Sequence, residues 1–478
     1  MKRQARAAFT ILIAVILFFG SMSVHAFATE ADIDAEIERR KNITIESNLI
    51  PSWPVGPETS AESAILIDAD TGIVLYEKNA HARLYPASIT KILTALIAYE
   101  NCNMNDMVTF SYEAVSSIDW RYDANMGINA NDSITMEQAL NGMLVGSANE
   151  AAYAIAEHVS GNLENFATLM NKRAKELGCT DSHFVTPNGI HDDDHYTSAY
   201  DMALIAQAFF ENDYLASIAG TPSYKIPVSA TQPNDNMVVY AKSKLFPGKE
   251  YAYEGLIGTK TGYTEYARQT LVSCAERDGL KLICVVMKDE APGQYTDTVE
   301  LFNYGFSNFT KTTIADKDSR YTISTSNMFD TKNDIFGKSD PILKIDPDDY
   351  IILPVGTDLE NTSSEVVYDD LNDNEIARID YFYSDKFVGY ASVIPYVDPS
   401  NNRGLGNDSP VIGEVEDEDL IFVNVYYLIG NTLIAALGLT IIFILFSLIR
   451  GGKRNKKRSN TNKDYNYKHK KLNWKQFK

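Results

Sequence analysis

The chain is 478 residues long and carries a formal net charge of −21 at pH 7. That length is enough for about two or three domains, each with its own hydrophobic core. Residues 450–478 hold twelve Lys or Arg and one acid, so the acidic excess lies in the body of the chain. A body without spare basic side chains cannot neutralise a phosphate backbone, which excludes nucleic-acid binding as its function.

The four cysteines form no C-x-x-C pair, so the sequence contains neither a zinc motif nor a thioredoxin-like motif of that kind. Cys274 and Cys284 flank a predicted hairpin turn at residues 276–279, and the two thiols can face each other across the strands. The alternative is two small unpaired thiols buried in apolar strands.

Residues 1–28 have the pattern of a secretory signal peptide, with a basic start, an apolar core and small residues at the end. We expect cleavage after Ala26 or Ala28, the alternative being an uncleaved anchor. The protein is therefore expected to leave the cytoplasm. Residues 29–58 form a polar lead-in that is expected to contribute little to a core.

The next region, residues 59–310, opens and closes with strand patterns and has helical patterns between them. Strands at both ends with helices between predict a sheet covered by helices, in which the first hairpin pairs with the last strands. Strands are predicted over 64–67, 73–76, 255–261, 269–275 and 280–288, helices over 88–100, 135–146, 150–159, 163–177, 198–210 and 297–309, and a β excursion over 224–245.

After this region the pattern changes to strand-like alternation with acidic turns, which predicts a small β domain over 311–398. Residues 399–419 read as an acidic linker. Residues 420–449 contain no charged side chain and exceed the about 20 residues that span a bilayer; a buried core helix is the alternative. The basic tail, 450–478, is expected on the cytoplasmic side, so the body would lie outside a single-pass membrane anchor.

One short motif points to nucleophilic catalysis. Ser88 and Lys91 lie one turn apart at the start of a predicted helix, so their side chains share a face. A serine hydroxyl needs a base to take its proton, and a buried lysine beside a second cation can be neutral near pH 7. Ser-x-x-Lys arises about once by chance in a chain of this length, and an N-cap serine with a surface lysine is the plain alternative.

Two further motifs accompany it in order. Ser147-Ala148-Asn149 lies between two predicted helices, and Lys260-Thr261-Gly262 lies on a predicted strand. Together the three form the S-x-x-K, S-x-N and K-T-G set of penicillin-binding proteins and serine β-lactamases.

The S-x-N motif also occurs at Ser160 and Ser400. Ser160 falls at a helix end, where Gly161 reads as a C-cap, and Ser400 lies in the linker. We favour Ser147 because a junction between helices can aim polar side chains into a cleft; its alternative role is an N-cap of the 150–159 helix.

Over about residues 60–310 the sequence resembles the low-molecular-mass D-alanyl-D-alanine carboxypeptidases of peptidase family S11. The matching stretches are 63–72, the Ser88 helix, 147–152, Met170-Asn171, 186–190, 197–204 and 260–264. The resemblance implies an α/β (α+β) serine β-lactamase/DD-peptidase-like transpeptidase fold, with a mixed five-stranded sheet, helices on both faces and an all-helical lobe.

By this resemblance, Ser88 is the nucleophile, Lys91 its base, and Ser147 a proton relay to the leaving amine. The oxyanion hole would be formed by the backbone N–H groups of Ser88 and Tyr263.

The resemblance also assigns the substrate contacts. Asn149 holds the substrate's peptide amide, Lys260 and Thr261 receive its terminal carboxylate, and Gly262 leaves room for the substrate strand.

The implied activity is removal of the terminal D-alanine from peptidoglycan stem pentapeptides through an acyl-enzyme, with β-lactam antibiotics as covalent inhibitors. No cofactor and no metal are expected. His191 and His195 lie among Asp192, Asp193 and Asp194, a cluster that can bind a cation but reads better as a solvated acidic loop. The alternatives are a β-lactam-binding membrane receptor, disfavoured by the short basic tail, and a β-lactamase, disfavoured because no equivalent of the class A deacylating glutamate follows Pro187.

The sequence departs from the family pattern at two places beside the expected cleft. Asn188 stands where the family usually has histidine, and Tyr266-Ala267-Arg268-Gln269 replaces a usual small Ala-Gly pair. Arg268 is therefore expected near the cleft, where it would alter which peptide is accepted.

Overall fold

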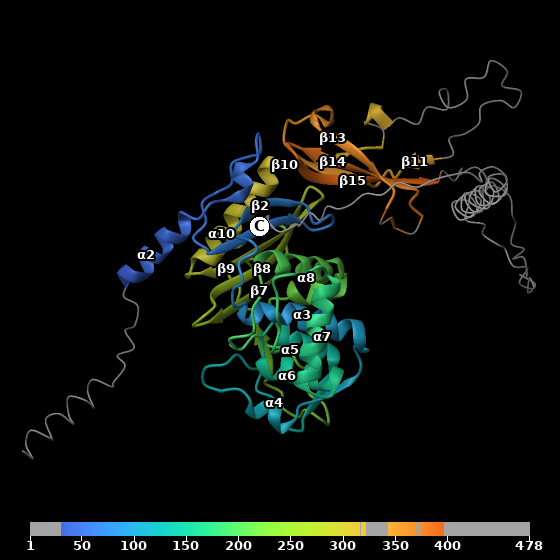
Figure 1. Ribbon diagram of the computed structural model, residues 1–478. Coiled ribbons are helices and arrows are strands. Elements are labelled where there is room, and N and C mark those ends of the chain that lie inside the picture. Colours follow the sequence, from blue (N-terminus) through green and yellow to red (C-terminus); the bar gives the residue numbers. More distant parts are fainter. Residues whose placement is uncertain (1–29, 316, 322–342, 370, 373, 396–478) are drawn as a thin grey trace, which may run out of the picture. The chain divides into compact units, whose positions relative to one another are not determined.

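The computed structural model (Figure 1) describes residues 30–315, 317–321, 343–369, 371–372 and 374–395. These residues belong to one compact unit that ends at Asp398. The predicted signal sequence, linker, membrane span and basic tail lie outside the described residues. Within the described part, no helix combines the length and apolar character that crossing a bilayer requires.

A five-stranded sheet forms the centre of the described region, in the order β2-β1-β9-β8-β7. Its strands are β1 (Ser63–Asp68), β2 (Val74–Lys78), β7 (Leu256–Thr264), β8 (Arg268–Arg277) and β9 (Leu280–Asp289). Every neighbouring pair is antiparallel, so the expected mixed sheet was wrong. Tight hairpins join β1 to β2 and β7 to β8 to β9, which forces antiparallel pairing there, and β1 also pairs antiparallel with β9.

Both faces of this sheet are covered, which is why β1 is buried along its whole length. One face packs against the helical lobe and the other against α10 (Gly293–Asn308). Cys274 belongs to the first core and Cys284 to the second. In the ladder Cys274 lies opposite Ile283 rather than Cys284, so the two thiols point to opposite faces and cannot pair. The interpretation as buried unpaired thiols is confirmed.

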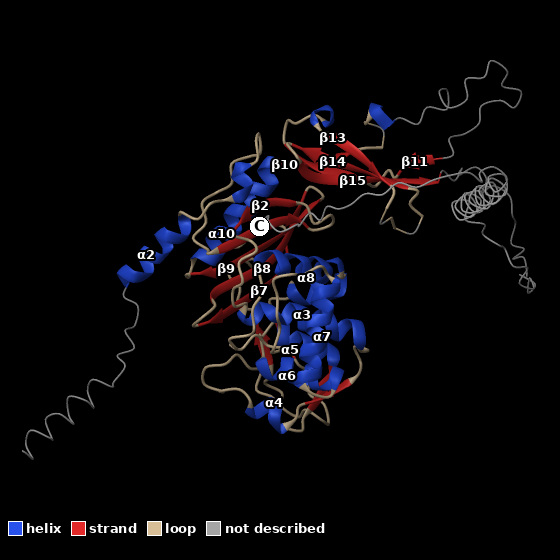
Figure 2. Cartoon of the chain, in the orientation of Figure 1, coloured by secondary structure: helices blue, strands red, loops and turns tan. Residues whose placement is uncertain are grey.

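The helical lobe gathers below the sheet in Figures 1 and 2. Its main helices are α3 (Lys91–Asn101), α5 (Met136–Leu144), α6 (Asn149–Ser160), α7 (Leu163–Glu176) and α8 (Ala199–Glu211). The sequence predicted all five to within a few residues but missed α9 (Asp213–Ala219), which follows α8 directly. Asn212 caps α9 by accepting a hydrogen bond from the Leu215 N–H, a start signal so close to the preceding helix that the two patterns merge.

The remaining elements are short. The predicted β excursion is a small antiparallel pair, β5 with β6, rather than a long ribbon. The other short elements before α10 are α2 (Glu30–Lys41), η1 (Glu46–Leu49), η2 (Ala87–Thr90), β3 (Met107–Thr109), α4 (Tyr112–Ser116), β4 (Ser133–Thr135), β5 (Ser223–Lys225) and β6 (Val238–Tyr240).

A second antiparallel sheet follows, in the order β10-β12-β15-β14-β13, with β11 paired to β15. Its strands are β10 (Phe309–Thr313), β11 (Leu343–Ile345), β12 (Tyr350–Pro354), β13 (Ser363–Val367), β14 (Ala377–Tyr383) and β15 (Lys386–Pro395), with one-turn helices η3 (Ser319–Tyr321) and η4 (Leu359–Asn361) beside them. This sheet is the β structure that the alternating sequence pattern predicted.

The polar lead-in contributes more to the core than its composition indicated. Trp53 is buried, donates a hydrogen bond from Nε1 to the Leu75 carbonyl at 2.9 Å, and packs on Phe309. Arg40 is buried as well, near Glu290 and Glu62. These contacts join distant parts of the chain, so a local pattern does not reveal them.

Candidate active site

Ser88 lies in the one-turn helix η2, which runs directly into α3 and so places Ser88 and Lys91 on one face. The Lys91 Nζ is 2.8 Å from the Ser88 Oγ. The turn starts from Ala87, whose φ of 52° is unusual for a residue with a side chain. A loop packs tightly on this turn, because a Cβ at Gly189 would come within 1.8 Å of the Ala87 carbonyl oxygen. The Thr-Pro-Asn-Gly stretch is thus part of the floor of the site.

The surroundings of Lys91 define its protonation state. The side chain is fully buried and its Nζ donates hydrogen bonds to the Asn149 Oδ1 at 2.7 Å and the Asn188 carbonyl at 2.8 Å. Burial, followed by the positive charges of Lys260 and Lys242, holds the pKa of Lys91 well below its usual range. A neutral amine has two N–H bonds and one lone pair. With both N–H bonds used by fixed acceptors, the lone pair is left facing the Ser88 hydroxyl.

Ser147 and Lys260 form the opposite wall. The Lys260 Nζ donates to the Ser147 Oγ at 2.9 Å and to the Thr261 carbonyl at 2.8 Å. Ser147 has a φ of 60°, and the N-cap of α6 is Ala148, which makes no side-chain capping bond. The hydroxyl of Ser147 is therefore committed to the cleft and not to the helix end. Burial, and then the charge of Lys242, lowers the pKa of Lys260 to about 7.

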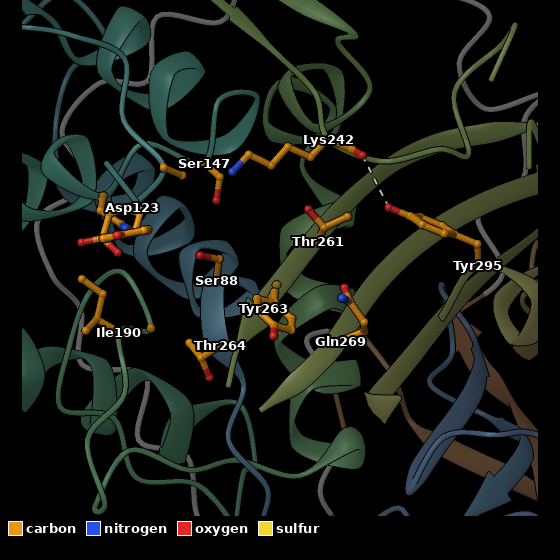
Figure 3. A pocket seen from close by; sticks show the side chains of 15 residues that line it. Ser88, Asp123, Ser147, Ile190, Lys242, Thr261, Tyr263, Thr264, Gln269 and Tyr295 are labelled. Carbon is orange, nitrogen blue, oxygen red and sulfur yellow. Dashed lines mark hydrogen bonds between the residues drawn. The ribbon is translucent and has the colours of Figure 1, made fainter. Parts of the chain in front are cut away.

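These side chains border a cavity of about 260 Å³ (Figure 3). In the figure Ser88, Ser147 and Thr261 surround the opening, and the nitrogen of Lys242 points toward Ser147. The residues that line the cavity are Ser88, Tyr122, Asp123, Ala124, Ser147, Asn149, Gly189, Ile190, Lys242, Thr261, Gly262, Tyr263, Thr264, Gln269 and Tyr295.

The predicted site residues are thus brought together from three distant segments. Ser88, Ser147 and Asn149 line the cavity with Thr261, Gly262 and Tyr263, while Lys91 and Lys260 lie buried just behind it. The other S-x-N serine within the described residues, Ser160, ends α6 next to the left-handed C-cap Gly161 and is not among the lining residues.

Gly262 is required for packing within the protein, apart from the expected role of leaving room for a substrate strand. A Cβ at this position would collide with the Thr270 hydroxyl, and it would lie 2.9 Å from the Ser88 backbone nitrogen and 3.0 Å from the Pro86 carbonyl oxygen. The glycine therefore lets β7 approach the backbone of the Ser88 turn, in addition to bordering the cavity. The same approach carries the backbone of Tyr263, whose ring is largely exposed, past Ser88.

Sequence reasoning missed Lys242 and Glu150. Lys242 lies in an irregular segment after β6, without a recognisable motif, and its backbone carbonyl accepts a hydrogen bond from the Tyr295 hydroxyl at 3.4 Å. It is a cation that faces the cavity, and burial lowers its pKa. Its position next to Ser243 and Lys244 carries no sequence signal of this role.

Glu150 is fully buried beside the site, directly after Asn149. Its Oε1 accepts from the Met126 N–H at 2.7 Å, and Oε2 has no partner among the described residues. Burial raises the pKa of Glu150 to about 7. A charged residue at the second position of a buried helix face is the only signal that the sequence offered.

The two departures from the family pattern have clear places. Arg268 pairs with Glu290, Nε to Oε1 at 2.9 Å, and does not line the cavity, whereas its neighbour Gln269 does. Asn188 uses its carbonyl oxygen to hold Lys91 and its Oδ1 to accept from the Ile190 N–H. The side chain that departs from the family pattern is thus engaged within its own loop.

His195 is not part of a solvated loop. It is buried, its Nδ1 accepts from the Val185 and Thr186 N–H groups at 2.9 and 3.1 Å, and its Nε2 lies 2.9 Å from the Thr90 hydroxyl. Burial lowers the pKa of His195 to about 4, so it is a neutral ring that braces the Ser88 turn. Its acidic neighbours Asp193 and Asp194 are exposed, as expected.

Comparison with known proteins agrees with this geometry. The sequence family described as D-alanyl-D-alanine carboxypeptidase, peptidase S11, matches residues 51–291. The chain is 33% identical over 259 residues to the D-alanyl-D-alanine carboxypeptidase DacF of Bacillus subtilis (strain 168), covering 52% of this chain and 63% of DacF. It is 31% identical over 258 residues to DacB2 of Mycobacterium tuberculosis, covering 52% of this chain and 84% of DacB2.

A likeness in three dimensions extends further along the chain. Penicillin binding protein 5 from Haemophilus influenzae matches with a TM-score of 0.57 and 25% identity, covering 72% of this chain and 99% of that protein. The aligned part of DacF is less than two thirds of its length, so the family assignment concerns the matched region. That region contains Ser88, Ser147 and Lys260 and makes up half of the chain, which therefore belongs to the D-alanyl-D-alanine carboxypeptidases of peptidase family S11, a family of penicillin-binding proteins.

Proposed function

We propose that the chain is a serine-type D-Ala-D-Ala carboxypeptidase that releases the terminal D-alanine of peptidoglycan stem pentapeptides through an acyl-enzyme on Ser88. The observation that carries the proposal is the position of the Lys91 Nζ, 2.8 Å from the Ser88 Oγ, with its other neighbours both acceptors. This arrangement supplies a base for a hydroxyl that is otherwise a weak nucleophile.

In the acylation step the Ser88 oxygen attacks the carbonyl carbon between the last two D-alanines, and its proton passes to the Lys91 Nζ. The carbonyl oxygen becomes an oxyanion, for which we assign the backbone N–H groups of Ser88 and Tyr263 as donors. The C–N bond then breaks, and the proton held by Lys91 passes through Ser147 to the leaving amine, which leaves Lys91 neutral again. In the second step water attacks the ester carbonyl and gives a proton to Lys91. The ester C–O bond then breaks, and Lys91 returns that proton to the Ser88 oxygen, which regenerates the free serine and releases the shortened peptide as an acid.

Recognition of a free carboxyl end follows from the cations around Thr261. Lys242 faces the cavity, and Lys260 lies behind Ser147, so both add positive potential where the Thr261 hydroxyl is exposed to the substrate. We assign the terminal carboxylate to this side of the cavity and the substrate's peptide amide to Asn149. A carboxylate held by charge-assisted hydrogen bonds distinguishes an exopeptidase substrate from an internal peptide bond.

We further propose that the catalytic region works outside the cell membrane and that β-lactams acylate the same serine. The support is the sequence pattern of residues 1–28 and 420–449, together with the penicillin-binding family. A β-lactam-binding receptor and a β-lactamase are the competing functions, and they differ from a carboxypeptidase in turnover. A receptor would not release D-alanine, and a β-lactamase would hydrolyse penicillin rapidly.

The test is mass spectrometry of the purified full-length chain with a peptide ending in D-Ala-D-Ala and, separately, with penicillin. We expect loss of one alanine from the peptide and a stable penicillin adduct on Ser88. Both should be lost in Ser88→Ala, with a fall in turnover of roughly 10⁴-fold or more. Ser160→Ala, the other described S-x-N serine, is the matched control and should behave as wild type. Wild-type turnover in Ser88→Ala would overturn the mechanism.

A further inference from the structure

A second cluster of chemically active side chains lies away from the cleft, at the far ends of α3 and α6. Cys102 follows the last residue of α3, His158 is in the last turn of α6, and Asp106 lies in the loop before β3. One ligand atom of each, the thiol sulfur, an imidazole nitrogen and a carboxylate oxygen, lies within 4.8 Å of the other two. We propose that these three side chains bind a zinc ion.

The donor set fits zinc better than the other common metals. Thiolate, imidazole and carboxylate together suit Zn²⁺, whereas calcium and magnesium prefer oxygen donors alone. In a tetrahedral zinc site the three donor atoms lie about 3.4–3.6 Å apart, so the cluster must contract by at most about 1.4 Å. The exposed imidazole of His158 can make that movement by side-chain rotation. Three protein ligands leave the fourth position for water.

The backbones that carry the ligands are already fixed. The Cys102 N–H donates to the Ala98 carbonyl at 3.0 Å and closes α3, while the Met136 N–H donates to the Asp106 carbonyl at 2.8 Å. The Asn103 N–H also donates to the Asp106 Oδ2 at 2.9 Å, which orients the carboxylate and leaves Oδ1 for a metal. Such a partner is the usual way in which a protein holds a ligating carboxylate in place. A zinc ion would therefore meet ligands on fixed backbone, and side-chain rotation is enough to close the site around it.

The position of the cluster, away from the cleft, indicates an ion that would stabilise the fold rather than take part in the reaction at Ser88. The α3 and α6 helices begin at the cleft, where Lys91 donates to Asn149, and Cys102 and His158 lie near their other ends. They therefore run parallel, and a rise of 1.5 Å per residue puts the cluster about 16 Å from the catalytic lysine. Zinc at this point would tie together the far ends of the two helices that carry Lys91 and Asn149. As the Zn–S bond forms, the Cys102 thiol releases its proton to solvent.

The test is titration of the metal-free full-length chain, kept reduced, with Co²⁺ as a spectroscopic substitute and then with Zn²⁺ as competitor. We expect one equivalent of Co²⁺ to produce a thiolate-to-cobalt charge-transfer band that Zn²⁺ removes, and Zn²⁺ to raise the thermal midpoint. Cys102→Ser should abolish the band, and His158→Gln should weaken Zn²⁺ binding roughly 100-fold or more. Cys179→Ser, the other half-buried cysteine, is the control and should keep the band.

Because His158 is exposed, His158→Gln tests the site even if Cys102→Ser fails to fold. Absence of the band in the wild-type chain, or a band that survives Cys102→Ser, overturns the proposal. So does Zn²⁺ binding that His158→Gln leaves unchanged. None of these outcomes bears on Ser88, since release of D-alanine should be the same with and without zinc.

Discussion

Lys260 on β7 reaches the hydroxyl of Ser147 at 2.9 Å, although 113 residues separate the two in the chain. The contact links the central sheet to the helical lobe across the mouth of the cavity. It also places a buried amine, with a pKa of about 7, close enough to lower the pKa of Lys91. The pKa of Lys91, the proposed base, is therefore lowered by a residue from the opposite wall.

Replacing Lys260 by Gln should shift the pH dependence of catalysis. Lys91 acts as a base only when neutral, so the acid limb of the kcat/KM profile reports its protonation. Burial and the charge of Lys260 hold the pKa of Lys91 low, and removing that charge lets this pKa rise. The acid limb of Lys260→Gln should move to higher pH, measured by D-alanine release. Lys244 is an exposed lysine paired with Glu250, and Lys244→Gln is the control. If the acid limb of the kcat/KM profile stays in place in Lys260→Gln, the charge of Lys260 does not lower the pKa of Lys91.

Lys242 should contribute to binding of the free carboxyl end. Lys242→Gln removes a charge-assisted contact, which corresponds to a fall in kcat/KM of about 10- to 100-fold. A peptide with a C-terminal amide has no carboxylate for Lys242 to contact. The kcat/KM values of the variant and the wild type should therefore be similar for that peptide. Steady-state kinetics on the two peptides measures this difference. An equal loss on both would assign Lys242 to the structure of the cavity instead.

Glu150 should make the folded state less stable as the pH rises. Burial raises its pKa from 4.5 to about 7, so the protonated form is favoured on folding. The stabilising contribution is full below about pH 4.5, declines between pH 4.5 and 7, and is absent above the folded pKa, with a total of about 1–3 kcal/mol. Glu150→Gln should remove this dependence and be the more stable form above pH 7, as measured by urea unfolding.

The exposed Glu164 of α7 supplies the control for that experiment. Glu164→Gln should keep the wild-type dependence of the unfolding free energy on pH. If Glu150→Gln retains the same slope as the wild type between pH 4.5 and 7, the buried carboxyl is not the titrating group.

A methyl group at position 262 should damage catalysis out of proportion to stability. In Gly262→Ala the new Cβ would collide with the Thr270 hydroxyl and lie 2.9 Å from the Ser88 nitrogen, so both the Thr270 side chain and the Ser88 turn must move away from β7. Displacing the Ser88 oxygen by about 1 Å from its working position costs about 10²-fold in rate. Penicillin acylation kinetics can measure this loss.

Gly248→Ala provides the comparison. Gly248 has a φ of 79° and nothing within 4 Å of its Cβ position, so alanine there costs about 1 kcal/mol of backbone strain without touching the site. It should unfold more easily than the wild type but acylate at the same rate. Equal acylation of both variants would contradict the packing argument.

The sequence alone determined the features that depend on local geometry. Ser88 and Lys91 are one turn apart, so any helix that starts there brings their side chains together. The hairpins around residues 68–72 and 276–279 define their strand pairs, and the alternation after Thr310 predicts a sheet. Such contacts lie within a few residues, where backbone periodicity decides which side chains share a face.

Only the tertiary structure decided the relations between distant segments. In the β8–β9 ladder Cys274 lies opposite Ile283, one residue away from Cys284, so the two thiols lie on opposite faces of the sheet. A predicted turn position is not accurate enough to show such an offset. The tertiary structure also brought Lys242 to the cavity and showed that Gly262 serves the close approach of β7 to Ser88.

The physical reason is that register, burial and desolvation depend on what packs from elsewhere in the chain. The pKa of Lys91 is lowered, and that of Glu150 is raised, only because other segments exclude water from the two side chains. The motifs thus identified the candidate reacting groups, and only the folded chain shows which residues surround them and in which direction their pKa values move.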